Sequence, residues 1–437
     1  MVHKILVIGS GAREHTIIRA LHRSSQAKKL YCLASNVNPG ISELCEELIV
    51  GSINDPEFVV SYAKKMDVTL AIIGPENPLE SGVADALWNA DVQTVGPKKD
   101  LAKLETSKAF TRNLFEEYNI PGGPKYQTFD SMNGAKGFLK ALEENYVVKY
   151  DGLMGGKGVR VADDHLHSHD EALAYCRELV EKGGKFVIEE KFLGQEFSLM
   201  SFCDGDSLKH MPAVQDHKRA YDGDRGPNTG GMGTYSDANH SLPFLTENDI
   251  KEAHAINSAT VKALKAKVGA SYKGVLYGGF MATAGGVKLI EYNARFGDPE
   301  VMNVLSLLES DLIDICIAMA DGTLNQADIR FSNKATVCKY AVPEGYPDNP
   351  VKGEAIDVSG ISNHDALFYG SVDINDGQLI EAGSRTVAVV GTADTLAEAE
   401  ALAEREICTI KGPLFHRSDI GAKPLVQQRI DHMNSLR

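Results

Sequence analysis

The sequence predicts an α/β and α+β multidomain fold, with an N-terminal doubly wound parallel sheet and a C-terminal mixed β domain. The chain has 437 residues, enough for about three ordinary domains. In the first hundred residues, short β-branched runs alternate with helix-like stretches, which is typical of a parallel sheet buried on both faces. In the last hundred residues, the pattern indicates antiparallel strands and one helix.

The N-terminal domain is expected at residues 1–120. Its predicted strands are Ile5–Ile8, Leu30–Leu33, Leu70–Ile73 and Val92–Val95. Residues near 104–120 predict one amphipathic helix, and the Pro121–Pro124 cluster that follows it marks a boundary or hinge.

The middle of the chain is expected to form two domains. Residues 121–192 predict a small α+β lobe built around one helix, Asp170–Glu181. Residues 193–328 predict a larger mixed domain with a long helix at Glu247–Val268. A further helix should begin with Asp298 as its N-cap and Pro299 at its first position.

The C-terminal domain is expected at residues 329–437. Its predicted strands include Ala335–Val342 and Thr386–Val390. A helix near 395–410 should open on the capping-box pattern Thr395-x-x-Glu398.

Composition and charge exclude several classes of protein. The net charge of −15 argues against a dedicated binder of nucleic acid or of acidic membranes, because such proteins need a basic surface. The seven cysteines are scattered without a C-x-x-C pair, which argues against a disulfide framework or a structural zinc site and fits a reducing cytosol. No apolar run approaches the length of a membrane span or of a signal peptide's core. We therefore expect a cytoplasmic monomer with no nucleic-acid or membrane partner.

The most informative segment for function is Val287–Ala294, a strand by composition. Because side chains alternate between the faces of a strand, Glu291, Asn293 and Arg295 should project together. The opposite face should carry Ile290, Tyr292 and Ala294. Two hard oxygen ligands suit Mg²⁺, and an adjacent guanidinium suits phosphate or carboxylate. The alternative is a solvated polar face of an antiparallel strand.

Two glycine-rich loops could contact phosphate. In Gly9–His15, which follows the first strand, Glu14 stands where a dinucleotide fingerprint has Gly or Ala, so nicotinamide binding is disfavoured. A substrate-phosphate site and a tight turn that needs glycine both remain open for this loop. The second loop, Asp151–Gly158, has four glycines around Lys157 and favours a flap that covers a nucleotide over a plain hairpin. Lys149 precedes it and faces either the inside of the flap or solvent.

Polar segments in the middle of the chain supply further candidates. Acids at the end of the strand Phe186–Glu190 could hold ribose hydroxyls, and the backbone there could pair with an adenine edge, although an exposed strand end is the simpler reading. The segments Gln215–Arg219 and Gly226–Gly233 belong to a loop too long for a simple connection. Its Asp and Lys could serve a small zwitterion or a phosphate, or could be surface charge. His217 has no spaced His or Cys partner, which argues against zinc there.

Together these motifs resemble the ATP-grasp superfamily and, more narrowly, the glycinamide ribonucleotide synthetase (phosphoribosylamine–glycine ligase) family. The resemblance covers the whole chain, and its last three motifs are specific to this ligase family. The motifs are Gly9–His15, Gly74–Leu79, Ser107–Phe110, Asp151–Val159, Gln215–Arg219, Gly226–Gly233 and Glu291–Glu300.

The resemblance implies an ATP-grasp domain with a mobile lid lobe at residues 121–192 and a central catalytic domain at residues 193–328. It also implies ATP as co-substrate, with Mg²⁺ or Mn²⁺ held by Glu291 and Asn293. The residues implied to bind ATP are Lys108, Lys149, Lys157, Glu189, Glu190, Leu193 and Glu196. Those implied to bind the other substrates are Gly11, Arg13, Glu14, Glu76, Asp216, Lys218, Asn228 and Arg295. Catalytic roles are implied for Lys157, Asp216, Lys218 and Arg295.

The implied reaction joins glycine to 5-phosphoribosylamine through glycyl phosphate, giving glycinamide ribonucleotide, ADP and phosphate for purine biosynthesis. One departure is that Gly278 and Gly279 stand where many ATP-grasp enzymes place a further metal-binding carboxylate. The alternatives are another ATP-grasp carboxylate–amine ligase, a Rossmann NAD-dependent oxidoreductase, or a non-catalytic nucleotide-binding protein.

Overall fold

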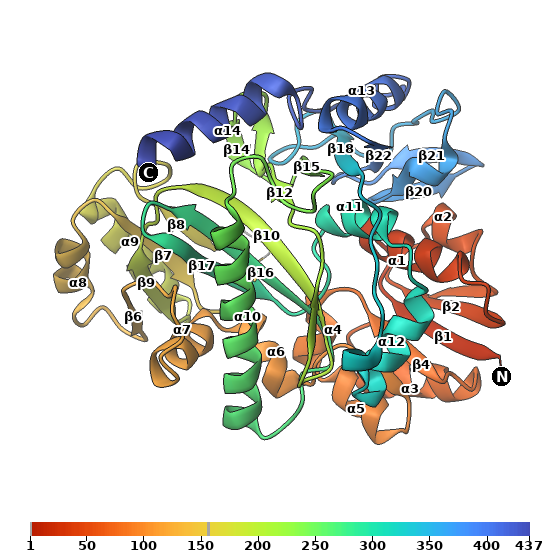
Figure 1. The fold of residues 1–437 in the computed structure, drawn as a ribbon, viewed down its shortest axis with the longest axis horizontal. Coiled ribbons are helices and arrows are strands. Elements are labelled where there is room, and N and C mark those ends of the chain that lie inside the picture. Colours follow the sequence, from red (N-terminus) through yellow and green to blue (C-terminus); the bar gives the residue numbers. More distant parts are fainter. Residues whose placement is uncertain (1, 155–157) are drawn as a thin grey trace.

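A computed structural model describes residues 2–154 and 158–437. The predicted α/β and α+β multidomain fold is confirmed, because a parallel sheet near the N-terminus is followed by antiparallel sheets. In Figure 1 the N-terminal sheet lies at the right, the lid lobe (residues 121–192) at the left, and the C-terminal elements across the top.

The N-terminal sheet has the strand order β3-β2-β1-β4-β5, and every neighbouring pair is parallel. Its strands are β1 (His3–Ile8), β2 (Lys28–Ala34), β3 (Glu47–Val50), β4 (Leu70–Ile73) and β5 (Gln93–Val95). Its helices are α1 (Ala12–His22), α2 (Pro39–Ser42), α3 (Pro56–Lys65), α4 (Glu76–Ser81) and α5 (Val83–Asn89). The four predicted strands are present. Strand β3 was not predicted, because its residues are only half-buried or exposed and lack the continuous apolar signal.

The strand order reverses between β1 and β4, and in such sheets ligands bind at this switch point, outside the carboxyl ends of the strands. The loop that starts at Gly9 follows β1, and the Gly74–Glu76 turn follows β4. These two motifs, about 65 residues apart in sequence, therefore meet at one edge of the sheet.

The single helix predicted near 104–120 is wrong. The structure has two helices, α6 (Lys99–Thr106) and α7 (Lys108–Glu117), separated by Ser107. The Ser107 hydroxyl accepts a hydrogen bond from the Phe110 backbone N–H at 3.0 Å, so it caps α7 and starts a new helix. This restart places Lys108 in the first turn of α7.

The lid lobe contains an antiparallel sheet of order β6-β9-β7-β8. Its elements are β6 (Tyr126–Phe129), α8 (Ala135–Leu142), β7 (Tyr146–Tyr150), β8 (Val159–Val161), α9 (His169–Glu181) and β9 (Phe186–Glu190). The sequence predicted α9 but not α8, which is short, contains Gly137 and has Gly134 as its N-cap, with no side chain to cap it. The apolar core of the lobe, from Phe129 to Ile188, is separate from the larger core that runs from Ile5 to Met433.

The links between the lid lobe and α7 are polar. The Asp151 carboxylate accepts hydrogen bonds from the Ser107 hydroxyl at 3.0 Å and from the Ala109 backbone N–H at 3.1 Å. The connecting segment is fixed to the central sheet by the Gly122 carbonyl, which accepts from the Leu289 N–H at 2.8 Å.

The central sheet has the antiparallel order β11-β10-β16-β17. Its strands are β10 (Gln195–Cys203), β11 (Leu208–His210), β16 (Gly274–Thr283) and β17 (Gly286–Asn293). The long helix α10 (Glu247–Val268) has its predicted bounds, and α11 (Glu300–Leu307) and α12 (Leu312–Asp321) follow the sheet. The predicted cap of α11 is wrong by one residue: Pro299 is the N-cap. The Asp298 carboxylate instead accepts from the Tyr340 hydroxyl at 2.8 Å.

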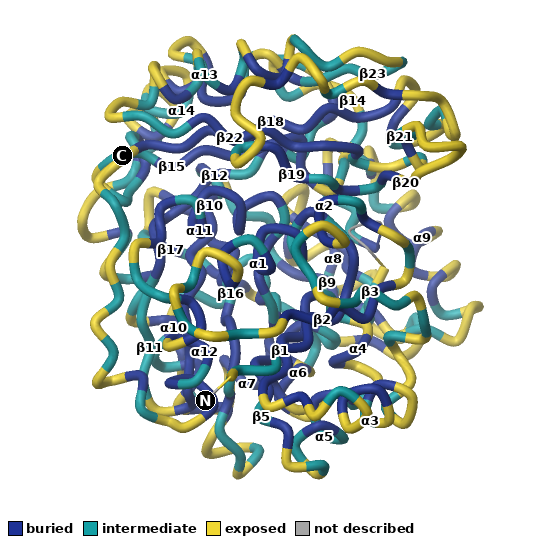
Figure 2. The backbone as a smooth tube through the Cα atoms, turned by 90° about the vertical axis from the view of Figure 1, so that its right-hand side faces the viewer, coloured by how far each residue is buried: buried dark blue, intermediate teal, exposed yellow. Residues whose placement is uncertain are grey.

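The C-terminal sheet has the order β12-β15-β18-β22-β19, with β23 also paired to β18. Its strands are β12 (Gln215–Asp216), β15 (Gly233–Ser236), β18 (Ala335–Pro343), β19 (Leu367–Tyr369), β22 (Val387–Ala393) and β23 (Leu414–Phe415). Two hairpins, β13 (Arg219–Tyr221) with β14 (Arg225–Asn228) and β20 (Val372–Asn375) with β21 (Gln378–Glu381), extend from it. Figure 2 shows β15, β18 and β22 as a buried layer.

Helix α13 (Leu396–Ile407) carries the predicted capping box, and α14 (Lys423–Leu436) follows it. Because β12 and β15 pair within the sheet that contains β18, the long polar loop of residues 216–236 is held by the C-terminal sheet. Among the described residues, no helix is both long and apolar enough to cross a membrane.

Candidate active site

One cavity of about 820 Å³ collects residues from the N-terminal sheet, the lid lobe, the central sheet and the polar loop. The predicted site residues that line it are Arg13, Glu76, Lys108, Lys149, Glu189, Glu190, Glu196, Asp216, Lys218, Asn228, Glu291, Asn293 and Arg295. Gly11, Glu14 and Leu193 do not line it, and Lys157 lies outside the described residues.

Strand β17 and the residues just after it form the floor of the cavity with Glu291, Asn293 and Arg295, as the predicted alternation indicates. The prediction that Ile290 points away is wrong, because the register between β16 and β17 shifts there and Ile290 also lines the cavity. This bulge frees the Ile290 carbonyl from the ladder. The carbonyl accepts from Arg112 Nη2 at 2.6 Å and from Lys149 Nζ at 3.0 Å.

Glu291 is held in its charged form by surrounding cations. Burial acts to raise the pKa of this carboxyl, but Lys108, Lys218, Lys149 and Arg295 together lower it below its usual value. The Asn293 amide oxygen, two residues along the strand, accepts from Arg295 Nη2 at 3.2 Å. Gly279 pairs with Glu291 across the sheet and adds no side chain. An ionised carboxylate and an amide oxygen in this position fit a hard divalent cation with several open coordination positions.

The lid side of the cavity is built on a buried cluster of ions. Lys149 faces inward, with its ammonium paired to the Glu189 carboxylate. Arg112 also binds Glu189, through Nε at 2.7 Å and Nη2 at 3.1 Å. Burial acts to raise the pKa of Glu189, but the two cations outweigh it and the pKa is lowered. Both Glu189 oxygens are thus occupied, and the cavity wall continues along Glu190–Phe192.

Near the end of this wall, the Glu196 carboxylate is paired with Lys218 Nζ at 2.8 Å. Lys218 follows β12 and Glu196 lies on β10, so this pair connects the polar loop with the central sheet. The nearby Glu196 charge raises the pKa of Lys218, which stays cationic.

At the opposite end, Arg295 contacts the N-terminal domain. It forms ion pairs with Glu105 at 3.0 Å and with Glu76 at 3.4 Å. Arg13 lies beside them and is paired with Glu14 at 2.6 Å. The other Glu14 oxygen accepts from the Gly11 N–H at 2.6 Å. Gly11 therefore fixes the Glu14 carboxylate, which in turn orients Arg13.

Three segments of the chain match the three domains of one protein family. Residues 3–105, 106–301 and 336–423 match the N domain, the ATP-grasp (A) domain and the C domain of phosphoribosylglycinamide synthetase. Phosphoribosylamine–glycine ligases from Methanosarcina barkeri and Methanocaldococcus jannaschii are 49% and 50% identical to this chain, over 99% of its length and 100% of theirs. The chain belongs to the phosphoribosylamine–glycine ligase family.

Solved structures agree with this membership. The crystal structure of phosphoribosylamine–glycine ligase from Thermotoga maritima has a TM-score of 0.81 at 26% identity and covers 95% of this chain and 100% of its own. A biotin carboxylase from Campylobacter jejuni has a TM-score of 0.73 at 13% identity, with 99% and 96% coverage, and shares the fold alone.

Within this ligase-family site, the sequence missed two residues at the part of the cavity lined by Asp216 and Glu300, here called the acidic end. Glu300 and Tyr277 line the cavity, and the Tyr277 hydroxyl donates to Glu300 at 2.8 Å. Burial and then Glu300 raise the pKa of Asp216, and burial raises the pKa of Glu300. The sequence did contain a signal for Glu300, because this residue is the last one of the Glu291–Glu300 motif.

The sequence also missed Arg385, which reaches this ligase-family site from the loop before β22. Its Nη1 donates to the Gly230 carbonyl at 2.6 Å and pairs with Asp298 at 3.2 Å, and its guanidinium lies 4.7 Å from the centre of the Tyr340 ring. No local pattern marks it, since its partners lie 45 to 155 residues away in the sequence.

Proposed function

We propose that this protein uses ATP to join glycine to 5-phosphoribosylamine, giving glycinamide ribonucleotide, ADP and phosphate in purine biosynthesis. The observation that carries the proposal is that Glu291 and Asn293 on β17, with Arg295 just after it, lie in one cavity with Lys108, Lys149 and Lys218. Membership of the phosphoribosylamine–glycine ligase family over the whole chain supports the choice of substrates.

At the lid side, the proposed ATP site uses Lys108, Lys149 and Lys157 for the phosphates. The segment from Glu189 to Leu193 is proposed to receive adenine and Glu196 the ribose. Two ion pairs support these roles, because Glu189 holds Lys149 and Lys218 holds Glu196 before a nucleotide binds. Leu193 is 60% exposed and lies beside the cavity lining, so its proposed contact is through the backbone at the rim.

Glu291 and Asn293 are proposed to hold Mg²⁺ or Mn²⁺. The lowered pKa of Glu291 supports this role, because a ligand that is already ionised needs no deprotonation. Bound there, the ion would neutralise charge on the β- and γ-phosphates of ATP.

At the acidic end, Asp216 and Lys218 are proposed to hold the two charges of glycine. The glycine carboxylate attacks the γ-phosphoryl group of ATP, giving glycyl phosphate and ADP, while Arg295 and Lys157 stabilise the transferring charge. The 5-phosphoribosylamine nitrogen then attacks the acyl carbon and phosphate leaves. Arg13, Glu76 and Asn228 are proposed to contact this amine substrate, with Gly11 and Glu14 positioning Arg13 from behind.

The acyl phosphate must be protected from water, which hydrolyses it. The lid lobe is proposed to close over the cavity for this purpose, and its separate core supports movement as one body. We further propose that the protein acts in the cytoplasm as a monomer, with small-molecule partners only. The net charge of −15 supports the absence of a nucleic-acid partner.

The decisive experiment measures ATP-dependent phosphate release with glycine and freshly prepared 5-phosphoribosylamine, against reactions that omit one component. We expect release only with the complete mixture. Equal release with other amino acids or amines would instead indicate another ATP-grasp ligase. Stabilisation by NAD, with none from ATP and a divalent metal, would overturn the proposal.

A further inference from the structure

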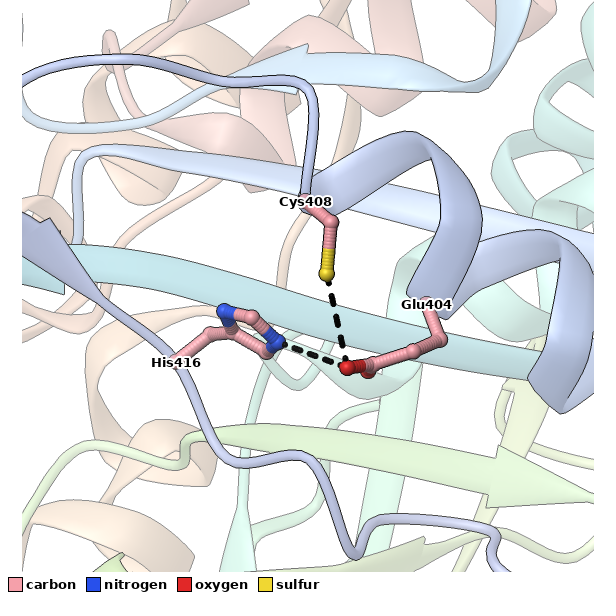
Figure 3. A group of neighbouring side chains, drawn as sticks. All are labelled: Glu404, Cys408 and His416. Atoms are coloured by element: carbon pink, nitrogen blue, oxygen red, sulfur yellow. Dashed lines mark hydrogen bonds and ion pairs between the residues drawn. The ribbon is translucent and has the colours of Figure 1, made fainter.

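A second polar cluster lies in the C-terminal domain, formed by Glu404, Cys408 and His416. Glu404 and Cys408 lie one turn apart at the end of α13, and His416 follows β23 (Figure 3). Their ligand atoms all lie within 4.8 Å of one another, and no other His, Cys, Asp or Glu trio among the described residues meets this criterion. The sequence argued against a structural zinc site because the cysteines are scattered without a C-x-x-C pair, and this cluster contains only one of them.

Two of the three distances in this cluster match those of a tetrahedral metal site, and the third, between Cys408 and His416, is within 4.8 Å. Glu404 Oε1 lies 3.2 Å from His416 Nε2 and 3.5 Å from Cys408 Sγ. Ligands bound to zinc with metal–ligand distances of about 2.0–2.3 Å have edges of roughly 3.3–3.6 Å. A cation could thus bind all three atoms with little movement of the backbone.

The Glu404 carboxylate is held in place from behind. Its second oxygen accepts from Lys339 Nζ at 2.6 Å, and this fully buried lysine is also bound by Glu400 at 2.7 Å and by the Ser418 carbonyl at 2.8 Å. Outer contacts of this kind orient metal ligands and fix which atom faces the ion. Here they leave Oε1 directed toward the imidazole and the sulfur.

We propose that Glu404, Cys408 and His416 bind a borderline divalent cation, with Zn²⁺ the best match. A thiolate, an imidazole and a carboxylate are the three protein ligand types that zinc prefers, and the exposed side of Cys408 leaves the fourth position to water. On binding, the Cys408 thiol releases its proton to solvent as the Zn–S bond forms. The ion would tie the end of α13 to the segment that leads into α14, away from the proposed ATP site.

The test uses the full-length protein, stripped of metal with a chelator and then titrated with ZnCl₂ against a chromogenic competitor. We expect one bound equivalent, with affinity weakened at least about tenfold by Cys408→Ser and by His416→Ala. Cys45→Ser removes a half-buried cysteine elsewhere and should leave the equivalent intact. Glu291→Gln should also leave it intact, which separates this site from the cavity.

Cobalt substitution provides an independent readout. Co²⁺ bound to the cluster should give a thiolate-to-metal charge-transfer band that Cys408→Ser abolishes and Cys45→Ser retains. Absence of a bound equivalent in the unmodified chain, or equal zinc affinity in the Cys408→Ser and His416→Ala variants, would overturn the proposal. The three side chains would then form only a hydrogen-bonded cluster.

Discussion

The two ends of the cavity contain enclosed carboxyl groups whose pKa values shift in opposite directions. At the lid side, Glu189 and Glu291 are surrounded by lysine and arginine, and their pKa values are lowered. At the acidic end, burial raises the pKa values of Asp216 and Glu300, and the nearby cations do not offset it. Burial alone therefore does not decide the charge of a carboxyl in this site. The cations around Glu189 and Glu291 reverse its effect.

The strongest test of the cation-rich end is Glu291→Gln. We expect a loss of turnover on the order of 10³-fold, because a neutral amide cannot hold the proposed metal against the phosphates. Phosphate release measures the loss, and thermal melting should show a folded protein. Lys288→Gln, on the same strand but outside the cavity, should keep most activity. Near-normal phosphate release by the Glu291 variant would remove the metal assignment.

Glu189→Gln tests whether the buried ion cluster is structural. It leaves the Arg112 and Lys149 cations without an anion, and breaking a buried pair in this way costs about 3–5 kcal/mol. Denaturant unfolding followed by hydrogen exchange in the lid lobe should locate the loss there. Among the described residues, the Glu190 carboxylate accepts from the Lys125 N–H at 3.1 Å and forms no ion pair, so Glu190→Gln should cost much less. Equal losses of stability in the two variants would show that the buried Arg112–Glu189–Lys149 cluster does not stabilise the lobe.

Glu300→Gln should have a small effect on stability, within about 1 kcal/mol. The amide resembles the protonated acid that the raised pKa favours, and its oxygen still accepts from Tyr277. Asp298→Asn is the matched comparison, because that carboxylate is paired with the half-buried Arg385 and its loss should cost more. Denaturant titration of both variants decides the order, and a larger cost for Glu300→Gln would contradict the raised pKa of Glu300.

The finest distinction lies in the pH dependence of unfolding. Glu189 has a folded pKa below the usual value of 4.5, so its contribution is present above pH 4.5 and is lost as the pH falls through the folded pKa. Glu300 has a raised pKa, so its contribution is present below pH 4.5 and is lost as the pH rises toward the folded pKa. Each proton changes the slope by at most about 1.4 kcal/mol per pH unit. The unfolding midpoint of each Gln variant should therefore be measured across pH. Glu189→Gln should weaken the pH dependence below pH 4.5, and Glu300→Gln should weaken it above pH 4.5.

The sequence could predict features that depend on local patterns. Four strands of the N-terminal sheet, α10, the α13 capping box and the shared face of Glu291, Asn293 and Arg295 follow from periodicity and caps. It could not predict the Ile290 bulge, because that depends on pairing with β16, nor Arg385, because its partners are distant in sequence. Whether Lys149 faces the cavity also required tertiary contacts, since strand alternation gives two faces without naming the inner one.

The separate core of the lid lobe has a thermodynamic consequence. Since the apolar clusters do not merge and links such as those through Asp151, Glu189 and the Ile290 carbonyl are polar, opening the lobe at these contacts would expose mainly polar surface. Such a motion carries little heat-capacity change, because that change follows the apolar area exposed to water. Its equilibrium should thus vary weakly with temperature and strongly with ionic strength, as salt weakens the ion pairs once water reaches them. Salt, rather than heat, would be the natural control of access to this cavity.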